Sequence, residues 1–177
     1  MIELLKHLDV SVFRTLNLCG TNPWFDMMAQ SFDMLVSKGI LFVLAFCLIF
    51  FTKKDKLVSI TLLAGMNTAY FLNTFIKNIV QRNRPYNNII NVNIRHMMDS
   101  FSFPSGHTAL AFTFAIIAAH FYKKYTMVFY FIAALIGLSR IYDGVHYPSD
   151  VIGGMILGLV TGKVLLVLTK ELWTNGE

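Results

Sequence analysis

The stretch Ser139-Arg140-Ile141-Tyr142-Asp143-Gly144-Val145-His146-Tyr147-Pro148-Ser149-Asp150 lies between two long apolar segments. It places an arginine, a histidine and a carboxylate close together in the chain. Charged groups beside hydrocarbon are costly, and they are usually kept for function. A histidine oriented by a carboxylate, with an arginine nearby, is a minimal set for chemistry on a phosphate group. The stretch lacks enough donors to hold a phosphate, so other segments must contribute them.

The composition is that of a membrane protein. Hydrophobic residues make up 55% of the 177 residues and charged residues 14%, against about 25% charged residues in a typical soluble domain. The net charge of +5 comes from short basic clusters between apolar runs. This pattern fits membrane topology and an anionic ligand better than a nucleic-acid-binding face. We therefore expect a single integral membrane domain over residues 1–177, with no nucleic-acid partner.

The N-terminal third leaves two alternatives open. Residues 1–18 predict an amphipathic helix whose polar face carries Lys6, Asp9 and Arg14. Its apolar face comprises Ile2, Leu5, Leu8, Val12 and Leu16. Such a helix lies in the membrane interface or packs on the bundle as a first helix. Residues 24–52 are apolar but interrupted by Ser37-Lys38-Gly39. They predict either one tilted or kinked span or two short helices in a hairpin.

Four later segments predict membrane helices, at residues 57–81, 105–122, 126–142 and 149–170. We therefore expect an all-α fold, a polytopic transmembrane bundle of about five to six membrane helices with an N-terminal amphipathic interfacial helix. In the last segment Gly154, Gly158 and Gly162 recur at every fourth position. This spacing lets a neighbouring helix approach closely.

Basic residues indicate the orientation of the bundle. They lie in two turns and near the C-terminus: Lys53, Lys54, Lys56, Lys123, Lys124 and Lys170. If the four later spans are right, all these places lie on one side, which the positive-inside rule makes cytoplasmic. The loop 82–104 and the turn 143–148 then lie together at the outer face.

Two other stretches at that face can contribute donors to a phosphate site. The first is Lys77-Asn78-Ile79-Val80-Gln81-Arg82-Asn83-Arg84-Pro85. Lys77 and Arg84 are either cations that snorkel from a helix end or phosphate ligands, with Arg84 forking two oxygens and Lys77 acting as a point charge. A polar stripe along the preceding helix favours a wet cavity over snorkelling; it comprises Asn67, Tyr70, Thr74 and Lys77. Arg82 is expected at the surface or against a lipid headgroup.

A second further stretch, Phe103-Pro104-Ser105-Gly106-His107, opens an apolar helix. Ser105 alone would indicate an ordinary N-cap, but His107 in the first turn favours an anion site at the positive end of the helix. In the opening stretch, Pro148 starts the last helix. Asp150 in its first turn can accept a hydrogen bond from His146 and fix its tautomer, or can simply complement the helix dipole. Arg140 would alternatively cap carbonyls at the end of the previous helix.

Together the three stretches resemble the signature of the type 2 phosphatidic acid phosphatase (PAP2) superfamily. That signature is a Lys, six residues, then Arg-Pro; Pro-Ser-Gly-His; and Ser-Arg, five residues, His, three residues, Asp. The matching positions are Lys77…Arg84-Pro85, Pro104-Ser105-Gly106-His107 and Ser139-Arg140…His146…Asp150. Residue type, spacing and order all agree. The departure is at the N-terminus, where the first helices look short against the six-helix core of the family.

The resemblance implies a membrane phosphatase that needs no metal or other cofactor. His146 would be the nucleophile, Asp150 would orient it, and His107 would protonate the leaving oxygen and then activate water. The phosphoryl oxygens would be held by Lys77, Arg84, Ser105, Gly106 and Arg140. The spacing of the possible metal ligands matches no zinc pattern, and the nearby cations would oppose a divalent ion; these ligands are His96, His107, His146, Asp143 and Asp150.

The implied substrate is a lipid phosphate or diphosphate that reaches the outer face of the bacterial inner membrane, with membrane lipids as the surroundings. Undecaprenyl diphosphate is the first expectation. Lipid A 1-phosphate, phosphatidylglycerol phosphate and phosphatidate are the alternatives. A different class, a catalytically inactive lipid-phosphate-binding or flippase-like protein, is disfavoured because binding needs only the cations, and His107, His146 and Asp150 are all present.

Overall fold

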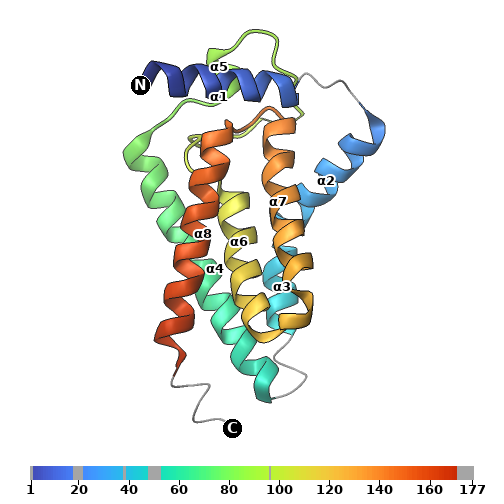
Figure 1. The fold of residues 1–177 in the computed structure, drawn as a ribbon, viewed down its shortest axis with the longest axis vertical. Helices are drawn as coiled ribbons and strands as arrows, with labels where there is room; N and C mark the ends of the chain where they lie inside the picture. The colour runs from blue at the N-terminus through green and yellow to red at the C-terminus, as the bar shows by residue number, and fades with distance from the viewer. Residues whose placement is uncertain (1, 18–21, 38, 48–52, 96, 171–177) are drawn as a thin grey trace.

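In the computed structural model, residues 2–17, 22–37, 39–47, 53–95 and 97–170 are described. Every regular element among them is a helix, which confirms the all-α class (Figure 1). The elements are α1 (Ile2–Asn17), α2 (Pro23–Ser37), α3 (Ile40–Cys47), α4 (Lys53–Val80), α5 (Pro85–Asn88), α6 (Gly106–Phe121), the 3-10 turn η2 (Lys123–Tyr125), α7 (Thr126–Tyr142) and α8 (Pro148–Leu168).

Helix α6 forms the centre of the bundle and packs against α4, α7 and α8. Its sequence is apolar on all sides and rich in alanine, and a helix of that kind is stable only when it is surrounded. The glycine repeat of α8 faces it. A Cβ atom at Gly154 would overlap the carbonyl oxygen of Ser105, and one at Gly158 would overlap that of Ala109. The two helices therefore approach at backbone distance, as the small-residue spacing predicted.

The four later helices lie within a few residues of their predicted ranges. The ambiguous segment 24–52 is helical in α2 and α3, which meet at a bend of 55°. A bend of this size fits either a broken span or a re-entrant loop, so the choice between one kinked span and two short helices stays open; residues 38 and 48–52 lie outside the described part.

The number of membrane spans is only partly supported. Two described stretches are long and apolar enough to cross a membrane, Lys123–Tyr142 and Pro148–Leu168, and the bent pair α2–α3 is a third candidate. Helix α6 is apolar but has only 16 residues, and α4 has 28 residues with polar side chains along it. The expected five to six spans therefore remain a prediction.

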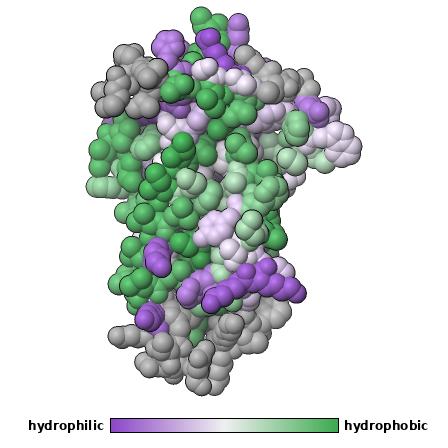
Figure 2. All heavy atoms as spheres, in the orientation of Figure 1, coloured by the Kyte–Doolittle hydropathy of each residue, from purple (hydrophilic) through white to green (hydrophobic). Residues whose placement is uncertain are grey.

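The ends of the bundle differ in character. The start of α4, the turn η2 and the end of α8 lie at one end, whereas the start of α6 and the α7–α8 connection lie at the other, beneath α1 (Figure 1). Figure 2 shows apolar residues over the middle of the visible face and hydrophilic residues towards both ends. The three sequence motifs thus meet at the end that carries α1, as the topology argument predicted.

Helix α1 lies across this end of the bundle rather than along it (Figure 1). It docks through Phe13, which is buried against Ile141 and Tyr147. Leu8 and Val12, from the predicted apolar face, are exposed. The inward face also includes Asp9, which accepts hydrogen bonds from the backbone N–H (2.8 Å) and the hydroxyl (2.5 Å) of Ser149. Packing on the bundle is therefore observed, and burial of α1 in a membrane interface remains a prediction.

The α6–α8 contact generates a prediction about stability. Gly158→Ala should lower the free energy of unfolding by about 1–3 kcal/mol, because the added methyl group must push α8 away from the backbone of Ala109. Val160→Ala on the exposed face of α8 is the control. Thermal unfolding in detergent measures both. A Gly158→Ala protein that is as stable as the wild type, or more stable as helix propensity alone would make it, would contradict the close packing.

Candidate active site

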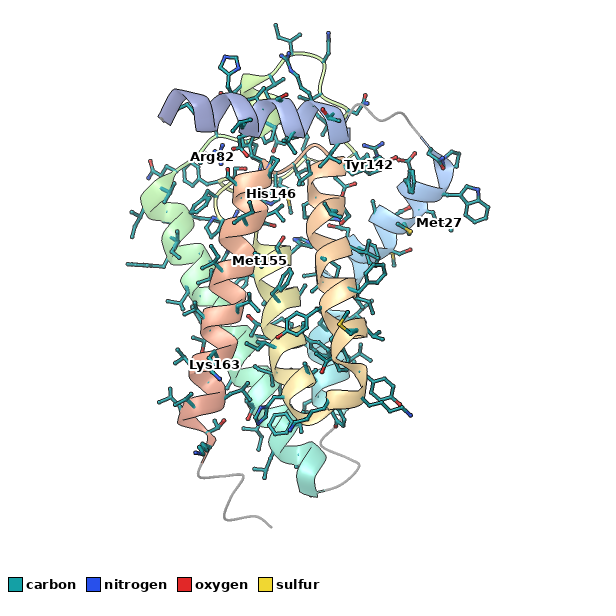
Figure 3. All side chains as sticks on the ribbon, viewed as in Figure 1. Met27, Arg82, Tyr142, His146, Met155 and Lys163 are labelled. Carbon is teal, nitrogen blue, oxygen red and sulfur yellow. The ribbon has the colours of Figure 1, made fainter. Side chains whose placement is uncertain are left out.

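A cavity of about 540 Å³ opens at the motif-bearing end of the bundle. Five of the predicted site residues line it: Lys77, Arg84, Gly106, His107 and His146. Tyr70 and Thr74 of the predicted polar stripe also line it, but Asn67, the fourth member of the stripe, is not part of the lining and is exposed. Figure 3 shows His146 and Arg82 at this end, beneath α1. Residues from three separate motifs therefore share one space.

His146 is held between a carboxylate and a cation. Its Nδ1 atom lies 3.5 Å from Asp150 Oδ2, and its Nε2 atom lies 3.4 Å from Nη1 of Arg84. Because Pro148 starts α8, Asp150 falls in the first turn and also accepts a hydrogen bond from the Tyr147 backbone N–H at 2.8 Å. The local chain conformation thus aims the carboxylate back at the imidazole.

The surroundings of His146 keep its imidazole neutral. Burial lowers the pKa of His146 to about 3, and the hydrogen bond that Asp150 accepts from the imidazole, which raises the pKa, does not offset burial and the charge of Arg84. A neutral imidazole retains the lone pair that a nucleophile needs.

Arg84 is positioned by neutral partners. It is almost fully buried and donates to the carbonyl oxygens of Ser100 (2.7 Å), Val145 (2.8 Å) and Phe101 (3.2 Å). Lys77 donates to the same Phe101 carbonyl. Carbonyl oxygens fix the two side chains without neutralising them, so their charge is available to an anion in the cavity.

Arg82 has a role that its predicted surface location missed. Its Nη1 atom lies 2.6 Å from Asp150 Oδ1, its Nη2 atom lies 2.6 Å from Asp9 Oδ2, and its guanidinium stacks 4.1 Å from the centre of the Tyr147 ring. The side chain is partly exposed, as a surface position predicts, but its guanidinium is held by two carboxylates of the protein. Asp150 is completely buried, and a buried carboxylate needs a charged partner of this kind.

Ser102 is a second residue that the motifs did not reveal. Its hydroxyl donates to Asp150 Oδ2 and lies 3.5 Å from His146 Nδ1. Its place in the loop before Pro104 carries no spacing signal, so the sequence alone gave no reason to select it.

At the start of α6, Ser105 and Gly106 occupy different environments. Ser105 is buried, its backbone N–H donates to the carbonyl of Asp150 (2.9 Å), and its hydroxyl accepts from Thr108 (2.9 Å). Gly106 lines the cavity and packs against Asn73. Asn73, another residue that the sequence did not single out, lines the cavity and donates to the Pro104 carbonyl at 3.1 Å.

Arg140 lies outside the lining of the cavity. Its Nη1 atom is 2.6 Å from Asp33 Oδ1 and its Nη2 atom is 2.7 Å from Asp143 Oδ2. The same Asp33 oxygen lies 3.1 Å from Nε2 of His107. Asp33, from α2, therefore connects Arg140 to a residue of the cavity wall.

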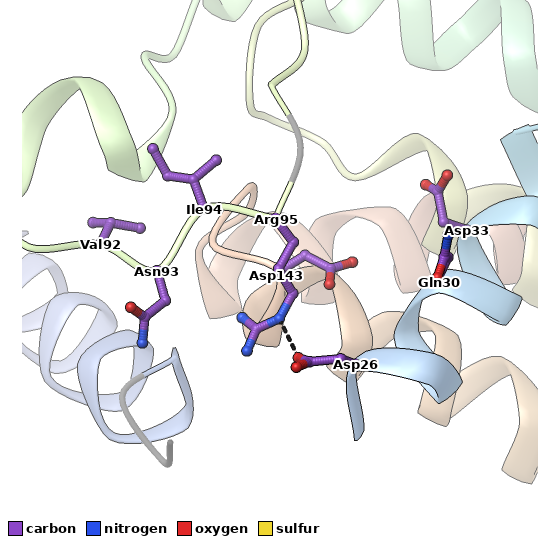
Figure 4. A pocket seen from close by; sticks show the side chains of 8 residues that line it. All are labelled: Asp26, Gln30, Asp33, Val92, Asn93, Ile94, Arg95 and Asp143. Atoms are coloured by element: carbon purple, nitrogen blue, oxygen red, sulfur yellow. Dashed lines mark hydrogen bonds and ion pairs between the residues drawn. The ribbon is translucent and has the colours of Figure 1, made fainter. Parts of the chain in front are cut away.

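A second cavity, of about 670 Å³, has Asp33 in its wall (Figure 4). Its lining is mainly polar: Asp26, Gln30, Asp33, Val92, Asn93, Ile94, Arg95 and Asp143. The dashed line in Figure 4 is the 2.6 Å ion pair between Arg95 and Asp26. Within the described residues, no group of three or more His, Cys, Asp and Glu side chains is arranged to hold a metal ion. His96, weighed above as a ligand, lies outside the described part.

Comparison with known proteins identifies the family of this chain. The family model "PAP2 superfamily" matches residues 58–173. The chain is 30% identical over 162 residues to the bacitracin transport permease protein BcrC of Bacillus licheniformis, covering 88% of this chain and 78% of that protein. It is 34% identical to an undecaprenyl-diphosphatase of Sulfolobus acidocaldarius, covering 89% and 72%.

Solved structures with the same fold include two crystal structures of bacterial proteins. The first transmembrane PAP2 type phosphatidylglycerolphosphate phosphatase from Bacillus subtilis superposes with a TM-score of 0.78 at 26% identity, covering 95% of this chain and 87% of that chain. LpxE of Aquifex aeolicus superposes with a TM-score of 0.72 at 32% identity, covering 90% and 94%. The family match extends over more than half of the chain and includes all three motifs. The chain therefore belongs to the PAP2 superfamily and is a phosphoric ester hydrolase.

Proposed function

We propose that this phosphatase hydrolyses a lipid diphosphate at the outer face of the bacterial inner membrane, converting undecaprenyl diphosphate to undecaprenyl phosphate through a phosphohistidine intermediate. The observation that carries the proposal is the shared cavity. Two imidazoles, from His107 and His146, line the same space as the cations of Lys77 and Arg84. Phosphoryl transfer depends on positioning and on stabilising charge at the transferred group, and this set supplies both.

In the first step His146 Nε2 attacks phosphorus, the bond from phosphorus to the leaving oxygen breaks, and His107 gives that oxygen a proton. In the second step His107 takes a proton from water, the water oxygen attacks phosphorus, and inorganic phosphate leaves His146. Asp150 orients His146 and stabilises the charge that its ring develops. Lys77, Arg84 and the Gly106 N–H hold the phosphoryl oxygens.

Arg140 and Ser105 stay in the proposal as further phosphate ligands, but Arg140 would have to exchange a partner and Ser105 would have to turn its side chain. Arg140 is bonded to Asp33 and Asp143, so it would have to leave Asp33 to reach a phosphoryl oxygen. Ser105 is bonded to Thr108 and would have to turn its hydroxyl towards Gly106.

A lipid substrate is supported by the apolar part of the cavity. Val36, Phe42 and Leu110 line it together with the catalytic residues. A volume of about 540 Å³ suits a phosphate headgroup and the first carbons of a chain, while the remaining chain stays in the bilayer. Relatives named as undecaprenyl-diphosphatases align over most of the chain, which favours that substrate. The superposition on a phosphatidylglycerolphosphate phosphatase supports a second candidate.

The substrate assignment predicts phosphate release from lipid phosphates. The purified protein in detergent should release inorganic phosphate from undecaprenyl diphosphate faster than from phosphatidylglycerol phosphate, phosphatidate or a lipid A 1-phosphate, and His146→Ala should release none. A colorimetric phosphate assay measures all four. Binding of these lipids without phosphate release by the wild type would indicate an inactive binding protein and overturn the proposal.

The fixed geometry of Arg84 predicts that catalysis depends on the planar guanidinium group as well as on its positive charge. Arg84→Lys should lower kcat/KM by about 100-fold to 1000-fold, because an ammonium cannot donate to two phosphoryl oxygens and the loop carbonyls together. Arg95→Lys is the matched control, since Arg95 also bonds a backbone carbonyl, that of Tyr142 at the end of α7, but lines the other cavity. Turnover of Arg84→Lys close to that of the control would refute a phosphate-binding role.

The lowered pKa of His146 predicts a pH dependence of stability. Between pH 6.5 and about 3 the unfolded chain binds a proton at this position that the folded chain does not. The free energy of unfolding should therefore fall as the pH falls below 6.5, by about 1.4 kcal/mol per pH unit from this group. His146→Asn removes that contribution, so thermal unfolding of the two proteins should diverge between pH 6 and pH 4. If the unfolding temperatures of the two proteins instead change in parallel with pH, His146 is not buried in its neutral form.

A further inference from the structure

Asp33 is a carboxylate that no PAP2 motif contains, yet it touches two residues of the motifs. Its Oδ1 atom lies 2.6 Å from Nη1 of Arg140 and 3.1 Å from Nε2 of His107. The side chain reaches them from α2, while Arg140 is on α7 and His107 on α6. Three helices therefore converge on one oxygen atom.

The position of His107 is unfavourable for the protonated imidazole that a general acid requires. It is the second residue of α6, where the positive end of the helix disfavours a cation. Lys77 and Arg84 line the same cavity, and like charges nearby also favour the neutral ring. A general acid at this place needs a compensating negative charge.

Asp33 supplies that charge. Arg140 has Asp143 as a second carboxylate partner, at 2.7 Å, so Asp143 balances the guanidinium and the charge of Asp33 can balance an imidazolium. The Nε2 atom of His107 is buried against Asp33, whereas the ring still contributes to the cavity wall. Among the described residues that line the cavity beside Asp33, the charged side chains other than Asp33 and Asp143 are Asp26 and Arg95, which pair with each other at 2.6 Å.

The two histidines of the cavity thus have opposite environments. The carboxylate beside His146 is Asp150, which is paired with Arg82, and Arg84 lies on the other side of the ring, so this site suits a neutral nucleophile. The carboxylate beside His107 is Asp33, which shares its cation Arg140 with Asp143, so this site can balance an imidazolium. Environments that separate two titratable groups in this way assign the acid and the base.

Building on the proposed function, we infer that Asp33 is a positioning residue that keeps His107 protonated and aligned, so that His107 can deliver its proton to the departing lipid oxygen. The proton that His107 loses in this step returns from water when the phosphohistidine is hydrolysed. Asp33 itself neither gains nor loses a proton.

The test compares two phosphate esters that differ in their need for a general acid. Dodecyl phosphate releases a poor leaving group, whereas 4-nitrophenyl phosphate releases one that departs without protonation. Asp33→Asn should lower kcat/KM for the dodecyl ester by about 100-fold and for the nitrophenyl ester by less than about 5-fold, because general acid catalysis is worth about 100-fold to 10,000-fold where it is needed. Asp33→Glu should restore at least part of the loss.

The ratio of the two kcat/KM values does not depend on how much of a variant is folded, so partial misfolding cannot imitate the result. The alkaline limb of the dodecyl phosphate pH profile should also move to lower pH in Asp33→Asn. Asp26→Asn is the matched control, because Asp26 lies on the same helix and lines the same cavity as Asp33. It should leave both the ratio and the pH profile unchanged.

Two results would overturn the inference. An equal loss on both esters with an unmoved alkaline limb would make Asp33 purely structural. A gain in kcat/KM on replacing Asp33 would show that its carboxylate blocks the place of the substrate. Failure of the proposed function itself would look different, because the wild type would then release no phosphate from any lipid phosphate or diphosphate.

Discussion

The buried carboxylate of Asp150 organises the motif-bearing end of this protein. It has no exposure to solvent, and a buried carboxylate is tolerated only when donors surround it. Arg82, just after α4, is one donor, and Ser102, in the loop before α6, is another. The α7–α8 connection supplies two more, the Tyr147 backbone N–H and His146. Satisfying one carboxylate therefore draws three separate segments together.

The same requirement reaches the N-terminal helix. Arg82 joins Asp150 to Asp9 of α1, and Asp9 also binds the first turn of α8. Below this network, the glycine face of α8 lets α6 approach at backbone distance, and the Ser105 N–H donates to the Asp150 carbonyl. Close helix packing and the satisfaction of the carboxylate thus support each other and set the start of α6 next to the start of α8.

Much of this arrangement could be predicted from local patterns. The helices α4, α6, α7 and α8 follow from apolar segments bounded by Pro104, Pro148 and the basic turns, and the three motifs led to the residues that line the cavity. The bend between α2 and α3 could not be decided, because an apolar run interrupted near Gly39 is compatible with both a hairpin and a kink. The inward face of α1 was also missed, because its apolar spacing favoured Leu8 and Val12, whereas ion pairing turns Asp9 inward.

The unpredicted site residues share a physical reason. Arg82 and Asp9 are 73 positions apart in the sequence, and Asp33 and Arg140 are 107 apart. Their pairing depends on where whole helices cross, and neither periodicity nor motif spacing contains that information. Ser102 and Asn73 act through backbone and carboxylate partners for which the sequence has no marker.

The geometry makes His146 the nucleophile, with its Nε2 atom towards Arg84 and its Nδ1 atom towards Asp150. The most direct measurement is mass spectrometry of the protein quenched at alkaline pH during turnover of undecaprenyl diphosphate, using His107→Ala to slow hydrolysis of the intermediate. An acid-labile phosphoryl group on the peptide that contains residue 146, absent from His146→Ala, is the predicted result. Phosphate release without any covalent phosphoryl-enzyme, or a phosphoryl group on another residue, would contradict it.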